Sequence, residues 1–280
     1  MKNVRVSWYG LHFGEEPPIS GTKGSGTIFF CHCNLKCVYC QNWQISQGLI
    51  EGKKYSIEDL VKIMFELEEK GAHNVNLVSP TIWNLYLKEV VSKAKKSGLK
   101  IPVVWNSNGY EEVDTLVGFA GIVDIYLPDY KYSDDLLAEK YSKVKNYSQK
   151  AQNAILEMQK QVGNLVLDEK GIAKKGLIVR HLVLPGELEN TKRCLEFIRS
   201  VSPNIHLSLM SQYNPVYQAE KYPEINRIIT KDEYENVLRY IDSLGFTNGW
   251  IQEFEGSTGC LNPDFTQKNP FLDVKYKELV

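Results

Sequence analysis

Residues 26–43 read GTIFFCHCNLKCVYCQNW, and this stretch predicts a strand followed by a metal-binding loop. Its first half is a short apolar run, which is typical of a strand buried on both faces of a sheet. Its second half places Cys33, Cys37 and Cys40 at the spacing C-x3-C-x2-C. Three thiolates so close together can hold one 4Fe–4S cube and leave its fourth iron open. An open metal position can chelate a further molecule, as it does in catalytic zinc sites.

The same loop also allows a zinc site, in which Cys31 or His32 would supply the fourth ligand. Structural zinc sites normally draw a second cysteine pair or a histidine pair from further along the chain, and neither follows here. Cys31 ends the strand and points away from its neighbours, so we expect a buried thiol there. His32 is expected to pack or to form hydrogen bonds. The loop therefore favours an iron–sulfur cluster over zinc.

Strand-like and helical segments alternate outward from this loop. The six candidate strands are residues 27–30, 74–78, 102–105, 123–127, 177–184 and 205–210. The candidate helices are residues 56–71, capped by Ser56, then 85–96, 136–162 with a break in the middle, 188–200 and 232–244. Six such units predict an α/β fold of parallel strands. The pattern alone allows either an open doubly wound sheet or a partial barrel.

Polar segments rich in glycine and proline follow the candidate strands. In both of these architectures, functional residues gather at the C-terminal ends of the strands. We therefore expect the site to be built from residues 31–43, 79–83, 106–110, 129–131, 185–187 and 211–215.

The chain has the composition of an ordinary globular protein. It has 280 residues and a net charge of −1, so nothing in its charge predicts a nucleic-acid or membrane partner. No apolar run approaches the roughly 20 residues that span a bilayer, and the first ten residues lack the apolar core of a secretory signal. We expect a cytoplasmic protein with a single domain over 1–280, a core at about 24–245 and terminal extensions packed on it.

The cysteine motif, placed after the first strand of a six-unit β/α chain, resembles the radical S-adenosylmethionine (radical SAM) superfamily, and relatives of the pyruvate formate-lyase activating enzyme in particular. The resemblance continues nearly to the end of the chain, through residues 71–81, 127–131, 179–186 and 210–215. It implies a partial (β/α)6 TIM-like barrel of parallel strands, one 4Fe–4S cluster, SAM, and a low-potential electron donor such as flavodoxin or ferredoxin. In that family the reduced cluster splits SAM into methionine and a 5′-deoxyadenosyl radical, which abstracts hydrogen from a substrate.

The resemblance also implies contacts with SAM. In the family, an aromatic residue at the position of Tyr39 packs near the cluster and the adenine. Ser79 stands where most relatives carry a Gly-Gly-Glu that holds the SAM amino group, so hydroxyls or carbonyls would have to accept that ammonium here. Lys131 is similar to a lysine that neutralises the SAM carboxylate, and Asp129 to an aspartate that often assists a monovalent cation.

Three further strand ends are expected to complete the SAM pocket. Asn106 and Asn108 can bind ribose hydroxyls or a carboxylate. Arg180 lies inside an apolar run, where a charge is costly unless it is paired, so we expect it to bind the SAM carboxylate or to form a structural salt bridge. Gln212 is our choice for a contact with the adenosyl group. Each of these expected SAM contacts also has a purely structural interpretation, such as a core tyrosine, a plain turn or a solvated ion pair. No catalytic side chain is assigned.

Three functions are compatible with these features. The favoured one is hydrogen abstraction from a small molecule or a peptide. The second is generation of a glycyl radical on a partner enzyme, and the third is a non-catalytic iron–sulfur or zinc protein. Cys194 and Cys260 are too few for an auxiliary four-cysteine cluster. The stretches Tyr9–Lys23 and Phe254–Phe271 are long for simple connectors, so we expect them to fold over the barrel and to favour a small substrate.

Overall fold

The computed structural model describes residues 3–254 and 262–271. Within these residues, one ten-stranded sheet has the order β10-β9-β8-β6-β5-β4-β2-β1-β3, with β7 paired to β8. The strands are β1 (Val4–His12), β2 (Ser25–Phe30), β3 (Lys53–Tyr55), β4 (Val75–Val78), β5 (Val103–Ser107), β6 (Ile125–Pro128), β7 (Val166–Leu167), β8 (Ala173–Leu182), β9 (His206–Met210) and β10 (Gly249–Ile251).

The helices lie mainly between the parallel strands. They are α1 (Pro17–Ser20), α2 (Trp43–Ser46), α3 (Ile57–Glu69), α4 (Asn84–Lys96), α5 (Val113–Val117), α6 (Asp135–Ser142), α7 (Tyr147–Val162), α8 (Leu188–Val201) and α9 (Lys231–Leu244). Three short 3-10 turns are η1 (Thr81–Trp83), η2 (Ala219–Lys221) and η3 (Pro223–Ile225).

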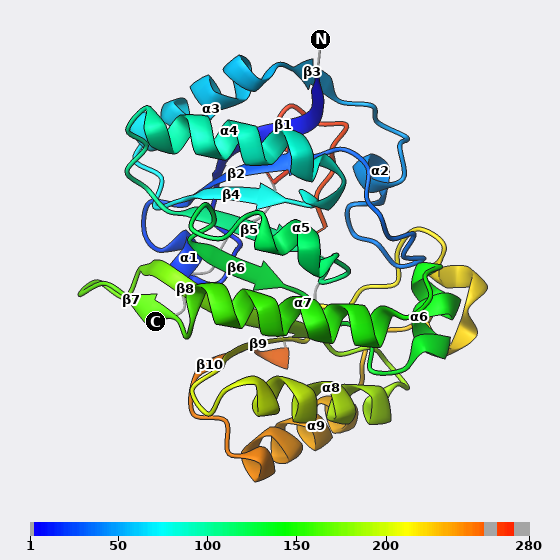
Figure 1. Cartoon of the computed structure of the whole chain (residues 1–280). Helices are drawn as coiled ribbons and strands as arrows, with labels where there is room; N and C mark the ends of the chain where they lie inside the picture. The colour runs from blue at the N-terminus through cyan, green and yellow to red at the C-terminus, as the bar shows by residue number, and fades with distance from the viewer. Residues whose placement is uncertain (1–2, 255–261, 272–280) are drawn as a thin grey trace.

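The predicted partial barrel is confirmed. The six predicted strands correspond to β2, β4, β5, β6, β8 and β9, and each pairs in parallel with the next. The long helices α3, α4, α7, α8 and α9 cover one face of the sheet (Figure 1), whereas a doubly wound sheet would carry helices on both. The sheet does not close, because β10 and β3 end the strand order at opposite edges.

Alternation along the strands separates an outer apolar layer from the inner face. Val103 and Trp105 of β5 pack in the large core beneath the helices, whereas Val104 packs in a second cluster with Ile125 and Ile178. Successive strand residues point to opposite faces, so this second cluster marks the inside of the barrel.

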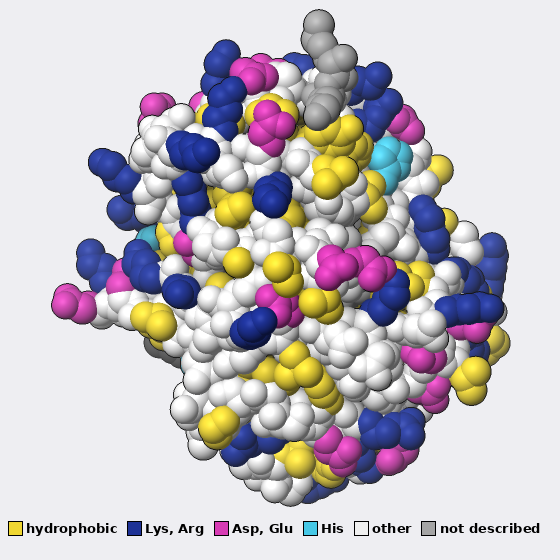
Figure 2. Space-filling model, viewed as in Figure 1, with side chains coloured by type: hydrophobic (Ala, Val, Ile, Leu, Met, Phe, Trp, Pro, Cys, Tyr) yellow, Lys and Arg dark blue, Asp and Glu magenta, His cyan; other side chains and the backbone are white. Residues whose placement is uncertain are grey.

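Local sequence signals set the helix boundaries. Ser56 caps α3 as predicted, since its hydroxyl accepts a hydrogen bond from the Asp59 amide and the Asp59 carboxylate accepts one from the Ser56 amide. The predicted break in residues 136–162 falls between α6 and α7, where Lys143 and Asn146 adopt positive φ angles of 60° and 55°. The face of the molecule shown in Figure 2 carries both charge signs intermixed.

The N-terminal segment differs from the prediction that residues 9–23 fold over the barrel. Residues 9–12 do not cover the barrel but belong to β1, which pairs antiparallel with both β2 and β3. The sequence pattern misses β1 because only Val4 and Val6 of its nine residues are fully buried, so the strand lacks a strong apolar alternation.

Residues 13–24 enter the barrel, and α1 lies on the face of the sheet that the long helices leave free (Figure 1). Ile19 is completely buried among the inner residues Val104, Ile125 and Leu127. The Asn74 side chain donates a hydrogen bond to the Ile19 carbonyl at 2.7 Å, which fixes the segment to β4. The N-terminal segment therefore forms a floor inside the barrel.

Part of the C-terminal stretch lies beside the cysteine loop. Phe265 packs with Phe29 and Val78, and the Phe265 amide donates a hydrogen bond to Oε1 of Gln44 at 2.8 Å. The other residues of the predicted covering stretch, 255–261, lie outside the described residues, and so does Cys260.

Candidate active site

The cysteine loop follows β2 and is held by the neighbouring α6. The Lys36 amide donates a hydrogen bond to the Ser142 carbonyl, and the Val38 amide donates one to the Tyr141 carbonyl. These backbone contacts place the loop beside the C-terminal ends of the central strands. The three thiols also influence one another, because Cys33 and Cys40 both add to the rise in the pKa of Cys37.

Each of the three cysteine sulfurs has a polar neighbour. The Asn108 side-chain amide donates a hydrogen bond to Sγ of Cys33 at 3.3 Å, and the Leu35 amide donates another at 3.4 Å. Sγ of Cys37 lies 3.0 Å from Oγ of Ser142, and Sγ of Cys40 lies 3.3 Å from Oγ of Ser46. Hydrogen bonds to sulfur are among the factors that set the potential of an iron–sulfur cluster.

The electrostatics of the loop suit a cationic partner for the sulfurs. Burial raises the pKa of Cys37 to about 12, and the charge of Lys131 opposes that rise. Burial also raises the pKa of Cys33 and Cys40, again opposed by Lys131. Buried thiolates need compensating positive charge, which the irons of a cluster supply. The donor set therefore fits an iron–sulfur cluster.

No three His, Cys, Asp or Glu side chains in residues 3–254 and 262–271 surround a point where a single metal ion could bind. A cube does not require such a group, because its cysteine ligands bind different irons. Cys31, the alternative fourth ligand for zinc, is fully buried, as the sequence predicts.

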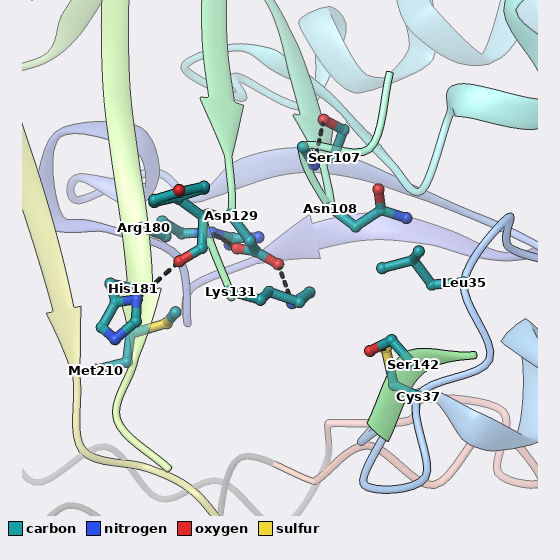
Figure 3. A network of polar contacts seen from close by, with 12 residues as sticks. Leu35, Cys37, Ser107, Asn108, Asp129, Lys131, Ser142, Arg180, His181 and Met210 are labelled. Carbon is teal, nitrogen blue, oxygen red and sulfur yellow. Dashed lines mark hydrogen bonds and ion pairs between the residues drawn. The ribbon is translucent and has the colours of Figure 1, made fainter. Parts of the chain in front are cut away.

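A row of alternating charges leads from the cysteine loop into the barrel. Nζ of Lys131 lies 2.6 Å from Oδ2 of Asp129, and Nε of Arg180 lies 2.7 Å from Oδ1 of the same carboxylate. Figure 3 shows Asp129 between the two cations. Burial raises the pKa of Asp129, but Arg180 and Lys131 outweigh burial and hold it below its ordinary value. Asp129 is therefore ionised and binds both cations.

The row continues to two glutamates of the N-terminal segment. Oε2 of Glu15 lies 3.5 Å from Nη1 of Arg180, and Oε1 of Glu16 lies 4.0 Å from Nε of Arg180. Oε1 of Glu15 also accepts hydrogen bonds from the side-chain amides of Asn76 and Asn106. Burial raises the pKa of Glu16 from 4.5 to about 7, and Arg180 offsets only part of that rise.

The structure places the expected SAM contacts in different surroundings. Asn108 lies at the cysteine loop, whereas Asn106 lies deeper, where its side-chain oxygen Oδ1 accepts a hydrogen bond from Nη2 of Arg180 at 2.7 Å. Tyr39 is buried in the outer core, with its hydroxyl 2.5 Å from that of Tyr132. Gln212 is hydrogen-bonded to the Gln252 side chain at the end of β9.

Two of the expected contacts have a defined structural role. Ser79 ends β4 with a φ of 58°, and its amide donates a hydrogen bond to the Asn106 carbonyl. Arg180 forms the structural salt bridge that the sequence allows. The next residue, His181, faces the opposite side of β8, where Nδ1 lies 2.7 Å from the Tyr130 carbonyl, and burial lowers its pKa to about 4.

Sequence reasoning missed the two glutamates and two of their polar neighbours, Asn76 and Ser208, although it named Asn106 and Arg180. The sequence predicts a covering segment at Glu15 and Glu16, because nothing local shows that the chain turns into the barrel. A signal was present in the strands, since Asn76, Asn106 and Ser208 interrupt otherwise apolar runs. Buried polar side chains require partners, so these three positions predict a polar interior.

The family model described as the radical SAM superfamily matches residues 27–198. The chain belongs to the radical SAM superfamily. The family implies a 4Fe–4S cluster and SAM, and the matched residues include the cysteine loop and the row from Lys131 to Arg180.

Similar proteins extend this result. The uncharacterized protein MJ0674 of Methanocaldococcus jannaschii is 37% identical over 247 residues, which are 84% of this chain and 67% of that protein. Among solved structures, SuiB of Streptococcus suis bound to its precursor peptide SuiA has a TM-score of 0.55 at 15% identity, covering 79% of this chain and 47% of SuiB. A spore photoproduct lyase variant with bound AdoMet and dinucleoside spore photoproduct has a TM-score of 0.52 at 12% identity, covering 80% and 74% of the two chains.

The likeness to solved structures concerns the fold. This radical SAM chain spans about half the length of SuiB. Among the residues that the structure describes, no helix is long and apolar enough to cross a membrane.

Proposed function

We propose that this protein is a radical SAM enzyme in which Cys33, Cys37 and Cys40 hold one 4Fe–4S cluster. When bound, the cluster and SAM would supply a 5′-deoxyadenosyl radical that abstracts hydrogen from a small-molecule or peptide substrate. The observation that carries the proposal is the position of the cysteine loop, beside Asn108 and next to the charged row that begins at Lys131.

The side chains around the loop suit the binding of SAM. Lys131 provides a positive charge, and its side chain keeps 16% of its surface exposed. It can therefore turn from Asp129 toward an incoming carboxylate. Asp129 keeps its charge and can accept a hydrogen bond from a ligand or assist a monovalent cation. Ser79, Tyr39 and Gln212 remain proposed contacts for SAM.

Two segments that pack in and beside the barrel support a substrate of limited size. Residues 13–24 form the floor of the barrel, and Phe265 packs with Phe29 and Ile45 beside the cysteine loop. An enzyme that closes over its substrate protects a radical from water and side reactions. Activation of a glycyl-radical enzyme, which the motif resemblance also implies, requires a mouth open to a protein loop and is the alternative.

The test is anaerobic reconstitution followed by reduction with dithionite in the presence of SAM. The proposed function predicts about four irons and four sulfides per chain, and slow release of 5′-deoxyadenosine measured by liquid chromatography and mass spectrometry. Cys37→Ala is the control and is expected to release none. A protein that binds the cluster but leaves SAM intact would support a non-catalytic iron–sulfur protein instead.

A further inference from the structure

The inside of the barrel holds more negative than positive charge. The carboxylates of Glu15, Glu16 and Asp129 form ion pairs there with Arg180, and Asp129 pairs also with Lys131. Within the described residues, these two cations are the only ones paired with the three carboxylates. One further positive charge would balance the network when all five groups are ionised.

Two buried acceptor atoms in this network have no hydrogen-bond partner among the described residues. They are Oε2 of Glu16 and Oδ1 of Asn76. Glu16 is 9% exposed and Asn76 is 0% exposed. Burying a polar atom without a partner is costly, and both atoms need an N–H or O–H donor. The site therefore lacks donors as well as positive charge.

The surrounding residues hold the two glutamates rigidly. Oε1 of Glu15 accepts hydrogen bonds from Asn76 and Asn106 at 3.0 Å and 3.2 Å. Oε1 of Glu16 accepts one from Oγ of Ser208 at 3.1 Å. Because Asn76, Asn106 and Ser208 come from β4, β5 and β9, the two carboxylates are fixed to separate strands. Such preorganisation is typical of a binding site.

Solvent reaches the network. The side chains of Arg180 and Asp129 each keep 15% of their surface exposed, and that of Glu15 keeps 9%. A fully closed core would leave these atoms inaccessible. A small group can therefore approach Glu15 and Arg180 directly, and it contacts Oε2 of Glu16, which has no accessible surface in this structure, once the Glu16 side chain turns toward it.

We propose that Glu15 and Glu16 bind a cationic nitrogen group, an ammonium or a guanidinium, of the substrate of this enzyme. The inference rests on the proposed function in naming that ligand as the substrate. An ammonium or guanidinium supplies both of the missing features, a positive charge and several N–H donors. A hydroxyl would supply a donor without charge, and a carboxylate or phosphate would be repelled.

The SAM amino group is a less suitable occupant of this position. If SAM binds the open iron through its amino and carboxylate groups, as in the family, its amino group would lie beside the cluster. Lys131 pairs with Asp129 alone among the three carboxylates, whereas Glu15 and Glu16 pair with Arg180. The two glutamates therefore lie beyond Asp129 and Arg180, at the far end of the row from the cluster.

The test is isothermal titration calorimetry at pH 8, where Glu16 is ionised, on the reconstituted protein, saturated with SAM and kept without reductant. The probes are n-butylammonium and n-butylguanidinium, with n-butanol as the neutral control. We expect both cations to bind and butanol not to bind. Glu16→Gln removes one charge with little change in shape. It should weaken the binding of both cationic probes by about tenfold or more. The exposed Glu169→Gln is the matched control and should bind them as the wild type does.

Equal binding of butanol and the cations would overturn the inference, and so would unchanged binding by Glu16→Gln. Displacement of SAM by the cations would assign the pair to SAM and also overturn it. If circular dichroism shows that Glu16→Gln is unfolded, the comparison of charged and neutral probes on the wild type decides.

Two sources of the cation can be separated in the same experiment. The peptide acetyl-Gly-Lys-Gly-amide carries the same ammonium as n-butylammonium. Tighter binding of the peptide indicates that the cationic group belongs to a side chain of a peptide substrate. Tighter binding of the amine indicates that it belongs to a small molecule. The calorimetry requires no turnover, so failure to release 5′-deoxyadenosine would reject the proposed function while leaving the cation measurement intact.

Discussion

Nε of Arg180 lies 2.7 Å from Oδ1 of Asp129, although the two residues are 51 positions apart in the chain. The pairing joins β8 to the end of β6, and Oδ2 of Asp129 holds Lys131 at the same time. Asp129→Asn leaves the two cations close together without the carboxylate between them. We expect the free energy of unfolding to fall by about 3 kcal/mol, measured by urea denaturation.

An exposed ion pair provides the control for this substitution. Nζ of Lys93 lies 2.6 Å from Oε1 of Glu58 on the outer surface. Solvent screens such pairs, so Glu58→Gln is expected to leave the denaturation midpoint unchanged. Equal losses in the two variants would show that the buried pairing adds nothing beyond an ordinary surface contact.

The second prediction concerns the cluster ligands. Replacing Cys33, Cys37 or Cys40 with alanine is expected to prevent cluster assembly, because each is proposed to ligate a different iron. Cys31→Ala and Cys194→Ala remove thiols that are fully buried elsewhere and should retain iron and sulfide. The measurements are iron and sulfide analysis and the visible absorption of the reconstituted proteins. Loss of iron in Cys31→Ala would rule out the three-ligand site.

The third prediction concerns the carboxylate of SAM. Lys131→Gln removes the buried positive charge that acts on all three cysteines and should weaken SAM binding by about 2–4 kcal/mol if the contact is desolvated. Lys36→Gln changes an exposed lysine of the loop itself and serves as the control. Equilibrium binding to the reconstituted protein measures both. Normal affinity in Lys131→Gln would move the proposed carboxylate site elsewhere.

The fourth prediction concerns Gly109, which follows Asn108 with a φ of 77°. A Cβ atom at Gly109 would lie 2.3 Å from the Asp129 carbonyl oxygen, so alanine must displace the strand end that carries the charged row. Gly121 has nearly the same φ, 75°, but a Cβ atom added there would meet no atom within 4 Å. Gly121→Ala therefore has only the backbone cost of about 1–2 kcal/mol.

We expect Gly109→Ala to lose more stability than Gly121→Ala in urea denaturation. It should also bind less iron on reconstitution, because Asn108 contacts Cys33. Matching unfolding curves for the two variants would mean that the loop accommodates the extra atom without moving Asp129.

The sequence is sufficient for the existence of the six central parallel strands and for the cysteine loop. Buried parallel strands are nearly continuous apolar runs, so β4, β5 and β6 are visible in the sequence without any knowledge of their neighbours. The C-x3-C-x2-C spacing is likewise a local feature of residues 33–40.

The inner half of the site is not a local feature. Glu15 meets Arg180, 165 positions away, and Glu16 meets Ser208, 192 positions away. These contacts exist because residues 13–24 turn into the barrel, where Ile19 is buried. Nothing in the pattern of residues 13–24 distinguishes an inner floor from an outer cover, so the pairing required the structure.

The last prediction concerns the pH dependence of stability. Burial raises the pKa of Glu16 from 4.5 to about 7. Between these two values the folded state holds a proton on Glu16 that the unfolded state has released, so the free energy of unfolding should fall as the pH rises through this window. The difference in pKa corresponds to about 3 kcal/mol in total.

Glu16→Gln keeps a neutral side chain at every pH and should remove this fall. The charged groups that act on the pKa of Glu16 are Arg180 and Glu15, and burial lowers the pKa of the neighbouring His12 to about 4. His12 is neutral across this window in the folded state. Glu16→Gln therefore leaves the contribution of His12 to the pH dependence of stability unchanged. Urea denaturation from pH 5 to pH 8 should show wild type and Glu16→Gln diverging with rising pH, while Glu169→Gln follows the wild type. Parallel curves for wild type and Glu16→Gln would mean that Glu16 is ionised throughout the window, its charge already balanced inside the barrel.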